Sequence, residues 1–574
     1  MPEFTFSSQL TIMKIKTTDE YKPFGTKMNI LLLMADQFRF DAMRCAGNTS
    51  IHTPNLDELA ASGQRFTHAF TPSPVCVAAR MSLITGQRIK QTHFAGNGCL
   101  STAEPVLPTL MNSLHDAGYR TQAVGKMHFR GKHYGFHDIK SQEECPDTLI
   151  DDDYLLFLQE HGIRTRFPHG YRNLLYFQPQ TTALPEPFTP EAWVANQSMK
   201  FLTDHLRNRG SKPFFLWSSW IAPHPPFAAC EPYDTMYSPD EVDWPDYTNR
   251  PLSDLPETVW PNRARLDGAL LDPERMRRIK ALYYGKVSHV DDCVGRLLRH
   301  LEELGLADDT IVIFTSDHGE MLGDHGLAQK QVPYEASIRI PFIVRWPKVT
   351  QSGQTSADLV TLLDLFPTLI DALDLPYAGN IASLAGKSLY HSVKNSDTSI
   401  TARCLSTNRN RIFIDLYSGK NRWIAVRTHD KKYVAWASGG REEFYDLVSD
   451  PNEHHNLDGQ QPEQVAQFRA EVINWERANG LSDTLDEDKL ETYPESAPPT
   501  EQACREVVIN QGQWAENWFI DEQADSCQQK SVETYAEAIR SALSKETFDL
   551  NSLSVETYMQ KTGHPIIDIV QEKK

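Results

Sequence analysis

The chain has 574 residues and a formal net charge of −19, from 57 basic and 76 acidic side chains. This acidic balance argues against a nucleic-acid-binding protein, which needs a basic face. Hydrophobic residues make up 40% and charged residues 23% of the chain, as in a soluble globular enzyme, and the length is too great for one simple core.

The N-terminal residues carry no signal that we recognise. Residues 1–27 lack the apolar stretch of a signal peptide and are expected to form an N-terminal extension. The first apolar run, 30–35, is too short for a membrane span of roughly 20 residues. Nine scattered cysteines without a CxxC pair suit a reducing compartment. We therefore predict a cytoplasmic protein without membrane contact, while an extracellular or periplasmic location stays open.

Short apolar runs alternate with amphipathic stretches between residues 28 and 400. The pattern predicts strands over 28–36 and 309–320, and a strand that runs into a proline-bounded loop within 213–227. It also predicts helices over 55–63 and 273–305, and a helix followed by a strand within 107–126. It is typical of an α/β fold in which a large, mainly parallel or mixed sheet lies between helices.

The pattern changes after about residue 400. Alternating, aromatic-rich segments over 411–457 predict an antiparallel meander, and a helix is expected at about 462–479. We therefore expect a main domain over 28–400 and a smaller antiparallel-sheet-plus-helix subdomain over 401–480. The polar tail, 481–574, contains helix-like pieces such as 531–545. It could cover a site or join subunits in a homo-oligomer.

Polar side chains follow several of the predicted strands at the point where each strand ends. These side chains are Asp36, Lys126, His128, His224, Asp317 and His318. Ligands of open α/β sheets bind beyond the carboxyl ends of the strands, so we expect these side chains to converge on one crevice.

The pair Asp317–His318 indicates a metal site. Carboxylate oxygens and an imidazole nitrogen suit a divalent cation, and Asp36 would add a further oxygen. A strand-end acid can equally be a helix cap, and Asp317 and His318 can be structural residues.

His224 stands in APHPPF, where flanking prolines fix the backbone and would aim the imidazole ring rigidly. Lys126 and His128, two residues apart, would share one face of an extended segment. Lys330 stands in AQKQVPYEAS. Each of these four side chains could instead be an ordinary surface residue.

Cys76, in SPVCVAARMSLITGQ, is predicted to lie in the first turn of a helix that Pro74 introduces. Free backbone amides and the helix dipole favour negative charge there, and Arg80 at i+4 lies on the same helical face. The arrangement suits a tetrahedral oxyanion. A buried, inert cysteine is the alternative.

Together these residues resemble the type I sulfatases of the alkaline phosphatase superfamily. The resemblance covers roughly residues 28–460 and rests on NILLLMADQFRFDAM, HTPNLDELAASGQRFTHAF, SPVCVAARMSLITGQ, GYRTQAVGKMHF, APHPPF, TSDHGEMLGDHGL, KQVPYEASIRIPFIV and EFYDLVSDPNEHHNL. It implies an alkaline-phosphatase-like fold, a catalytic domain over 28–400, and hydrolysis of a small sulfate ester.

The resemblance also implies a cofactor made from the chain itself. In such enzymes a cysteine, here Cys76, is oxidised by a modifying enzyme to formylglycine (3-oxoalanine). One oxygen of its hydrate binds the metal and attacks sulfur, and the aldehyde later re-forms and expels sulfate. The implied metal ligands are Asp36, Asp317, His318 and the modified Cys76, with Gln37 as a further ligand or neighbour. Ca²⁺ is favoured, and Mn²⁺ stays open.

The remaining roles follow from the same resemblance. His128 would be the base for the elimination of sulfate. His224 and Lys330 would contact the sulfate group and protonate the leaving oxygen. Arg80 and Lys126 would hold the formylglycine and neutralise charge in the transition state.

Asn97, in AGNGC, falls where related enzymes place a substrate-contacting asparagine. The residues do not distinguish a choline-like, aryl or sugar leaving group.

Two features depart from the commonest sulfatase pattern. The usual core reads Cys-x-Pro-x-Arg, whereas this chain has CVAAR, and the modifying enzyme reads that segment. Gln37 and His318 resemble choline sulfatases and phosphonate monoester hydrolases, while Lys126 and His128 resemble the sulfatase side of that divide. We therefore expect a sulfatase, with a phosphonate monoester hydrolase or phosphodiesterase as the alternative. An inactive, sulfatase-like binding protein is a third possibility.

Overall fold

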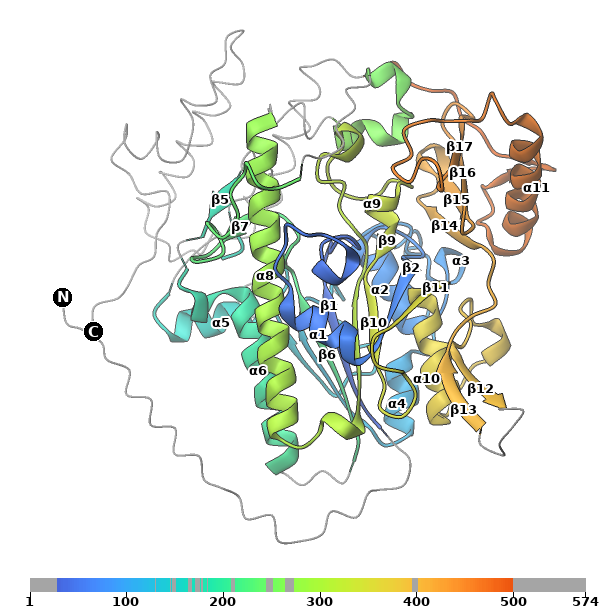
Figure 1. Cartoon of the computed structure of the whole chain (residues 1–574). Helices are drawn as coiled ribbons and strands as arrows, with labels where there is room; N and C mark the ends of the chain where they lie inside the picture. The colour runs from blue at the N-terminus through green and yellow to red at the C-terminus, as the bar shows by residue number, and fades with distance from the viewer. Residues whose placement is uncertain are drawn as a thin grey trace.

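Strand β1, Asn29–Ala35, lies inside a nine-stranded sheet (Figure 1). Its sequence NILLLMA is apolar after the first residue, as expected for a strand that is buried on both faces. Alternate side chains enter different cores: Ile30 and Leu32 face one, and Leu31 and Leu33 face the other. The sheet therefore separates two hydrophobic layers.

The computed structural model describes residues 28–498, apart from short gaps at 130, 145, 147–150, 164–167, 171–175, 177–178, 183, 208–211, 244–250, 264–272 and 395–400. The N-terminal extension, the helix predicted over 531–545 and most of the tail lie outside the described residues.

The strands of the large sheet follow the spatial order β11-β2-β10-β8-β1-β6-β3-β4, with β9 paired to β2. Besides β1, they are β2 (Gln64–Phe70), β3 (Arg120–Gly125), β4 (Asp138–Ser141), β6 (Phe214–Trp220), β8 (Thr310–Ser316), β9 (Arg339–Ile340), β10 (Phe342–Arg345) and β11 (Gln354–Thr361).

Most of these strands run in the same direction. β1 pairs in parallel with β6 and β8, and β3 pairs in parallel with β4 and β6. β10 is antiparallel to both β8 and β2, so β2 also runs with β1. The carboxyl ends of β1, β2, β3, β4, β6 and β8 therefore meet at one edge of the sheet.

Helices cover both faces of the sheet. The layer that includes Leu31 and Leu33 is completed by α1 (Pro54–Ser62), α6 (Pro190–Arg207) and the long α8 (Pro273–Glu303). The opposite layer is completed by α2 (Cys76–Thr85), α4 (Leu110–Asp116) and α10 (Leu365–Leu373). Shorter helices are α3 (Ile89–Thr92), α5 (Asp153–Glu160) and α9 (Glu335–Ile338). The predicted α/β fold with a mostly parallel sheet between helices is confirmed.

The C-terminal part has its own antiparallel sheet, drawn in orange in Figure 1. Its strands, in order, are β14 (Ile412–Leu416), β15 (Trp423–Arg427), β16 (Lys431–Trp436) and β17 (Glu442–Asp446). Helix α11 (Pro462–Asn479) packs Val465, Phe468 and Val472 against this sheet. The predicted antiparallel meander and the helix that follows it are confirmed.

Small two-stranded pieces complete the described chain: β5 (Gln180–Thr181) with β7 (Ala228–Ala229), β12 (Tyr390–Lys394) with β13 (Thr401–Leu405), and β18 (Leu485–Asp486) with β19 (Lys489–Leu490). Within the described residues, every helix is too short or too polar to cross a membrane.

Candidate active site

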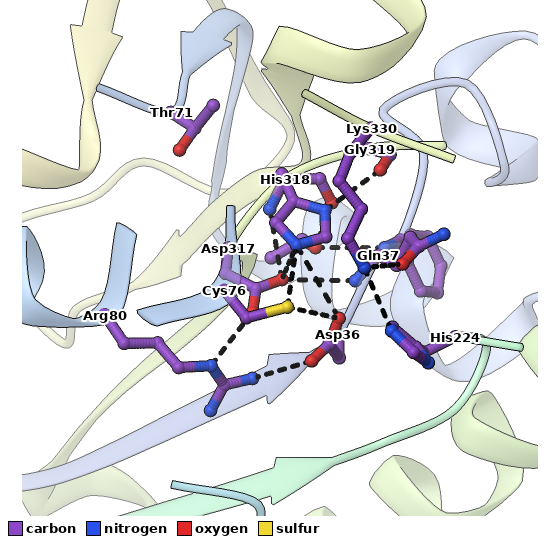
Figure 2. Close-up of polar contacts among 12 residues, drawn as sticks. Asp36, Gln37, Thr71, Cys76, Arg80, His224, Asp317, His318, Gly319 and Lys330 are labelled. Carbon is purple, nitrogen blue, oxygen red and sulfur yellow. Dashed lines mark hydrogen bonds and ion pairs between the residues drawn. The ribbon is translucent and has the colours of Figure 1, made fainter. Parts of the chain in front are cut away.

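Side chains from several strand ends surround the thiol of Cys76 (Figure 2). Cys76 is the first residue of α2, as predicted, and is 1% exposed. Its Sγ lies 3.2 Å from His318 Nε2 and 3.8 Å from Asp36 Oδ1. Lys126 Nζ lies 3.9 Å from the same sulfur. Several of the side chains predicted at the carboxyl ends of the strands thus converge on this residue.

The guanidinium group of Arg80 forms hydrogen bonds to several strand ends of the site. It is fully buried, and its Nε donates to Asp317 Oδ2 over 2.9 Å. The guanidinium also reaches Asp36 Oδ2 at 3.5 Å, Ser219 Oγ at 2.9 Å and the carbonyl oxygen of Lys126 at 2.5 Å. A planar fork with five N–H donors can make these contacts together, which an ammonium group cannot.

The two carboxylates at the site stay ionised despite their burial. Burial raises the pKa of Asp36, but the cations of Lys126 and Arg80 outweigh it and hold that pKa below its usual value. Burial also raises the pKa of Asp317, but His318, Arg80 and Lys126 together lower it by more, so this pKa too lies below its usual value. Both side chains therefore carry anionic oxygens that could bind a cation.

Four donor atoms at this position fit a divalent cation. One atom each of Asp36, Cys76, Asp317 and His318 lie within 4.8 Å of one another. The Sγ–Nε2, Sγ–Oδ1 and Nε2–Oδ1 separations among them run from 3.2 to 3.8 Å. Ligand atoms placed roughly 2.0–2.6 Å from one ion lie at such distances from each other.

The ring of His318 is already oriented for a metal. Its Nδ1 lies 3.0 Å from the carbonyl oxygen of Gly319, which can only accept, so Nδ1 carries the proton. The lone pair of Nε2 is thereby directed at the Cys76 sulfur. Metal-binding histidines are commonly fixed by such a hydrogen bond on the second ring nitrogen.

The unmodified thiol is not activated by its surroundings. Burial raises the pKa of Cys76 to about 12, and the Asp36 carboxylate adds to the effect. The side chains around it thus favour the neutral thiol, although the residue starts a helix. The helix N-terminus predicted from the sequence is present, but it does not by itself produce a thiolate.

Lys330 and His224 face the thiol from another side of the site (Figure 2). Lys330 Nζ lies 2.9 Å from His224 Nε2 and donates over 2.5 Å to Gln37 Oε1. His224 Nδ1 lies 2.6 Å from the carbonyl oxygen of Pro225, so it is the protonated nitrogen. Burial also lowers the pKa of His224 well below its usual value. The imidazole is therefore neutral, and its Nε2 accepts a hydrogen bond from Lys330.

Gln37 lies beside the metal position. Its amide oxygen accepts from Lys330, and its Nε2 donates to Glu320. Its backbone N–H donates to Asp317 Oδ1 over 3.1 Å. Here the side chain is a neighbour that links Lys330 to Glu320, and its role as a ligand stays a prediction.

The C-terminal sheet holds the segment that carries Lys330. Trp423 Nε1 donates to the carbonyl of Gln331 over 3.0 Å, and Lys432 Nζ donates to the carbonyl of Pro333 over 2.7 Å. Asn262, from the main domain, donates to the carbonyl of Lys330 itself over 2.6 Å. The small sheet thus helps to position a residue of the site.

His128 does not lie on an extended segment, so that prediction is wrong. Strand β3 ends at Gly125, which has φ +95°, and His128 itself has φ +61°. A Cβ at Gly125 would collide with the carbonyl oxygen of Ser219, so only glycine fits this turn. Lys126 is consequently fully buried at the thiol, while His128 lies half-buried to one side.

Glu143 holds this turn. Its Oε1 accepts the backbone N–H of Met127 over 3.0 Å and that of His128 over 2.9 Å. Its own N–H donates to Asp152 Oδ2 over 2.6 Å. The carboxylate therefore stabilises an uncommon left-handed conformation at a histidine, and we identify Glu143 as a positioning residue.

Replacing Glu143 by alanine is expected to lower kcat by roughly 10- to 100-fold with little change in KM, because two backbone N–H groups lose their acceptor and His128 moves. Steady-state kinetics on a sulfate ester measure this effect. Glu143→Gln keeps an acceptor oxygen and should retain most of the activity. Wild-type kcat in Glu143→Ala would contradict the role.

Asn97 lies at the first turn of α2. Its Oδ1 is 3.5 Å from the backbone nitrogen of Val77, and the residue is exposed. This position is compatible with the predicted substrate contact, which stays a prediction.

The sequence did not point to Glu143 or to its neighbour Glu144, whose carboxylate lies 2.8 Å from Lys126 Nζ. Both follow β4, which is a parallel strand like the others that end at the site. A pair of acidic residues after a strand could have indicated them. However, the sequence of β4 is DIKS, which lacks the apolar run that identifies a buried strand.

Comparisons with known proteins agree with this geometry. The family model described as Sulfatase matches residues 28–375, and the one described as N-sulphoglucosamine sulphohydrolase, C-terminal, matches residues 323–476. An arylsulfatase of Clostridium perfringens is 31% identical over 470 residues, which cover 75% of this chain and 90% of the relative. A choline-sulfatase of Rhizobium meliloti is 29% identical over 444 residues, which cover 75% and 82%.

Among solved structures, the phosphonate monoester hydrolase of Agrobacterium radiobacter superposes with a TM-score of 0.64 at 24% identity, covering 79% of this chain and 96% of that one. At this identity the likeness shows the alkaline-phosphatase-like fold. The family match spans more than half of the chain and includes every strand end that contributes to the site. The chain belongs to the sulfatase family of the alkaline phosphatase superfamily and is a sulfuric-ester hydrolase.

Proposed function

We propose that the protein hydrolyses a small sulfate ester by cleaving the S–O bond of the ester. The nucleophile would be the formylglycine that is made from Cys76. The observation that carries the proposal is the position of Cys76 Sγ, which lies 3.2–3.9 Å from donor atoms of His318, Asp36 and Lys126. When present, the formylglycine hydrate and a divalent cation would supply the nucleophile and a Lewis acid.

Two buried cations support the attack on sulfur. Lys126 forms ion pairs of 2.5 Å with Asp36 and 2.8 Å with Glu144, so its ammonium group is held beside the reacting position. Arg80 fixes Asp36 and Asp317, two of the proposed ligands. Preorganised charges in a site with little water stabilise the negative charge that develops in the transition state.

Lys330 and His224 form the proposed proton-donating pair for the leaving oxygen. Lys330 bears the protons, and it already donates to His224 Nε2 over 2.9 Å. Both side chains are almost fully buried, so a proton passes to the ester oxygen without competition from bulk water.

His128 is the proposed base for the expulsion of sulfate. Burial, with the Lys126 cation, lowers the pKa of its imidazole to about 3, so the ring is neutral at ordinary pH and its lone pair is free before the reaction. Its Nδ1 is buried without a hydrogen-bond partner. A buried polar atom without a partner is uncommon in a native protein and is suited to a transient contact in the reaction.

The function is tested by kcat/KM for two esters with the same leaving group, 4-nitrophenyl sulfate and bis(4-nitrophenyl) phosphate. We expect the sulfate ester to be preferred. The alternative, a phosphonate monoester hydrolase or phosphodiesterase, is supported by Gln37 and His318, and a clear preference for the phosphodiester would establish it. Hydrolysis of neither ester, nor of aliphatic and sugar sulfates, would contradict both.

Removal of the metal is expected to lower the activity by at least about 100-fold, because the cation is proposed to polarise the sulfate and hold the nucleophile. The melting temperature should also fall, since Asp36 and Asp317 repel each other within the buried site. Chelation followed by activity assays and thermal unfolding measures both effects. Full activity in protein shown by elemental analysis to be metal-free would contradict the proposed site.

The identity of the ion follows from adding metals back to the chelated protein. Two carboxylates and one imidazole form an oxygen-rich donor set, which favours Ca²⁺ and also accepts Mn²⁺. We propose Ca²⁺, and restoration by Mn²⁺ alone would reverse this choice.

The modifying enzyme is a proposed partner that acts before folding. All ten residues of α2 are buried, so neither Cys76 nor the CVAAR segment is accessible in the folded chain. A cytoplasmic location, the absence of nucleic-acid and membrane partners, and a homo-oligomer formed through the tail stay predictions from the sequence.

A further inference from the structure

Glu144 introduces a negative charge on the side of the site where the sulfate group is expected. Its Oε2 lies 2.8 Å from Lys126 Nζ and 3.6 Å from His224 Nε2. These partners belong to the groups proposed to contact the sulfate and the reacting residue. The Glu144 side chain is 11% exposed, whereas that of Lys126 is fully buried. The Glu144 carboxylate is therefore nearer to solvent than the Lys126 ammonium group.

This carboxylate differs from the other acids at the thiol. Asp36 and Asp317 both lie in the proposed metal group, where a divalent cation would offset their charge. Glu144 is outside that group and lies beside Lys126 and His224. Because His224 is neutral, the charge of Glu144 offsets the positive field of Lys126 toward a bound anion.

Such an arrangement affects monoanions and dianions differently. A sulfate monoester and a phosphate diester each carry one negative charge, whereas a phosphate monoester carries close to two at pH 8. The Coulomb energy between a fixed carboxylate and a bound ester is proportional to the charge of the ester. A carboxylate within a few ångströms of the tetrahedral group thus penalises the dianion about twice as much as the monoanion.

We infer that Glu144 is a specificity-determining residue that makes the site select monoanionic tetrahedral esters over dianionic phosphate monoesters. The inference rests on the proposed function, because it places the sulfate group between Cys76, Lys126 and His224. It adds to that function a discrimination against phosphate monoesters. This discrimination comes from the charge of Glu144 and not from the metal.

The test uses Glu144→Gln, which keeps the size and an acceptor oxygen for Lys126 but removes the charge. Three substrates share one leaving group: 4-nitrophenyl sulfate, 4-nitrophenyl phosphate and bis(4-nitrophenyl) phosphate. At pH 8 we expect the ratio of kcat/KM for the phosphate monoester to that for the sulfate ester to rise about tenfold. The ratio for the diester to the sulfate ester should stay within about twofold. Each ratio is taken on one preparation, so the fraction of Cys76 that has been converted cancels.

Two further variants separate charge from position. Glu144→Asp keeps the charge and shortens the side chain, so it should lower all three activities and leave the monoester ratio low. Glu160→Gln makes the same chemical change at an exposed position on α5 and should alter nothing. If monoester turnover is below detection, the inhibition constants of phenyl phosphate and phenyl sulfate give the same comparison.

An unchanged monoester ratio in Glu144→Gln, or an equal rise for the monoester and the diester, would overturn the inference while the sulfatase function stands. A wild-type protein that hydrolyses no sulfate ester would instead refute the proposed function itself.

Discussion

Replacing Cys76 by alanine is expected to abolish sulfate-ester hydrolysis, with a loss of kcat of at least about 10⁴-fold. The reason is that this position is proposed to supply both the nucleophile and a metal ligand, and nothing else at the site replaces it. Among the described residues, Cys76 is the only cysteine in the four-residue metal group. The measurement is kcat for 4-nitrophenyl sulfate in wild-type and variant proteins prepared with the modifying enzyme.

The fold should tolerate this change. Alanine is the best helix former and replaces a small, buried side chain at the start of α2. Thermal unfolding should therefore shift by only a few degrees, since small-volume losses of this kind cost about 1 kcal/mol. Cys404→Ala, in the β12–β13 hairpin, is the matched control and should keep full activity. Undiminished turnover in Cys76→Ala would refute the nucleophile.

Replacing Arg80 by methionine is expected to destabilise the protein by about 3–5 kcal/mol and to lower kcat/KM by at least about 10³-fold. The guanidinium is fully buried and pairs with two buried carboxylates, so its loss removes the ion-pair partner of Asp317 and leaves Asp36 with Lys126 alone. Without it, Asp36 and Asp317 also lose the donor that fixes them around the metal. Denaturant unfolding and steady-state kinetics measure the two effects.

Two variants show which part of the effect belongs to the site. Arg80→Lys keeps the charge but cannot reach Asp317, Asp36 and Ser219 together, so most of the activity should still be lost. Arg409→Met breaks another buried ion pair, the 2.6 Å contact with Asp364, outside the site. It should destabilise the fold while leaving kcat/KM of the folded protein unchanged. Wild-type kinetics in Arg80→Lys would contradict the fork-like role.

The sequence predicted the parts of the fold in which local pattern and tertiary environment agree. Strands β1 and β8 are apolar runs that end on an acid, and both lie in the sheet with Asp36 and Asp317 at its carboxyl edge. The helix that begins at Cys76 followed from Pro74 and from good helix formers. In these segments the local hydrophobic periodicity, or a single residue such as a proline at a helix start, was enough to predict the structure.

Other features depended on contacts between distant segments. The left-handed turn at His128 requires the Glu143 carboxylate and the close approach of Gly125 to Ser219, and no periodicity indicates either. Lys330 has its position because Asn262 and the C-terminal sheet bind its segment. Lys330 alone resembles any surface lysine in the sequence, and only the resemblance to sulfatases singled it out.

The acid pair that follows β4 shows a third limit. β4 is a short strand at the edge of the large sheet, and edge strands need not be apolar. Its polar sequence concealed a further strand end at the site, and with it Glu143 and Glu144. Side chains that orient others, or that set the local charge, are thus the part of an active site that sequence patterns predict least.

The central claim is that Cys76 becomes formylglycine and acts at sulfur. The most direct measurement is mass spectrometry of the Cys76-containing peptide from protein made in its native host, with kcat determined on the same preparation. We predict that the peptide carries the aldehyde in place of the thiol, and that activity follows the converted fraction. An unmodified Cys76 thiol throughout a fully active preparation would contradict the account.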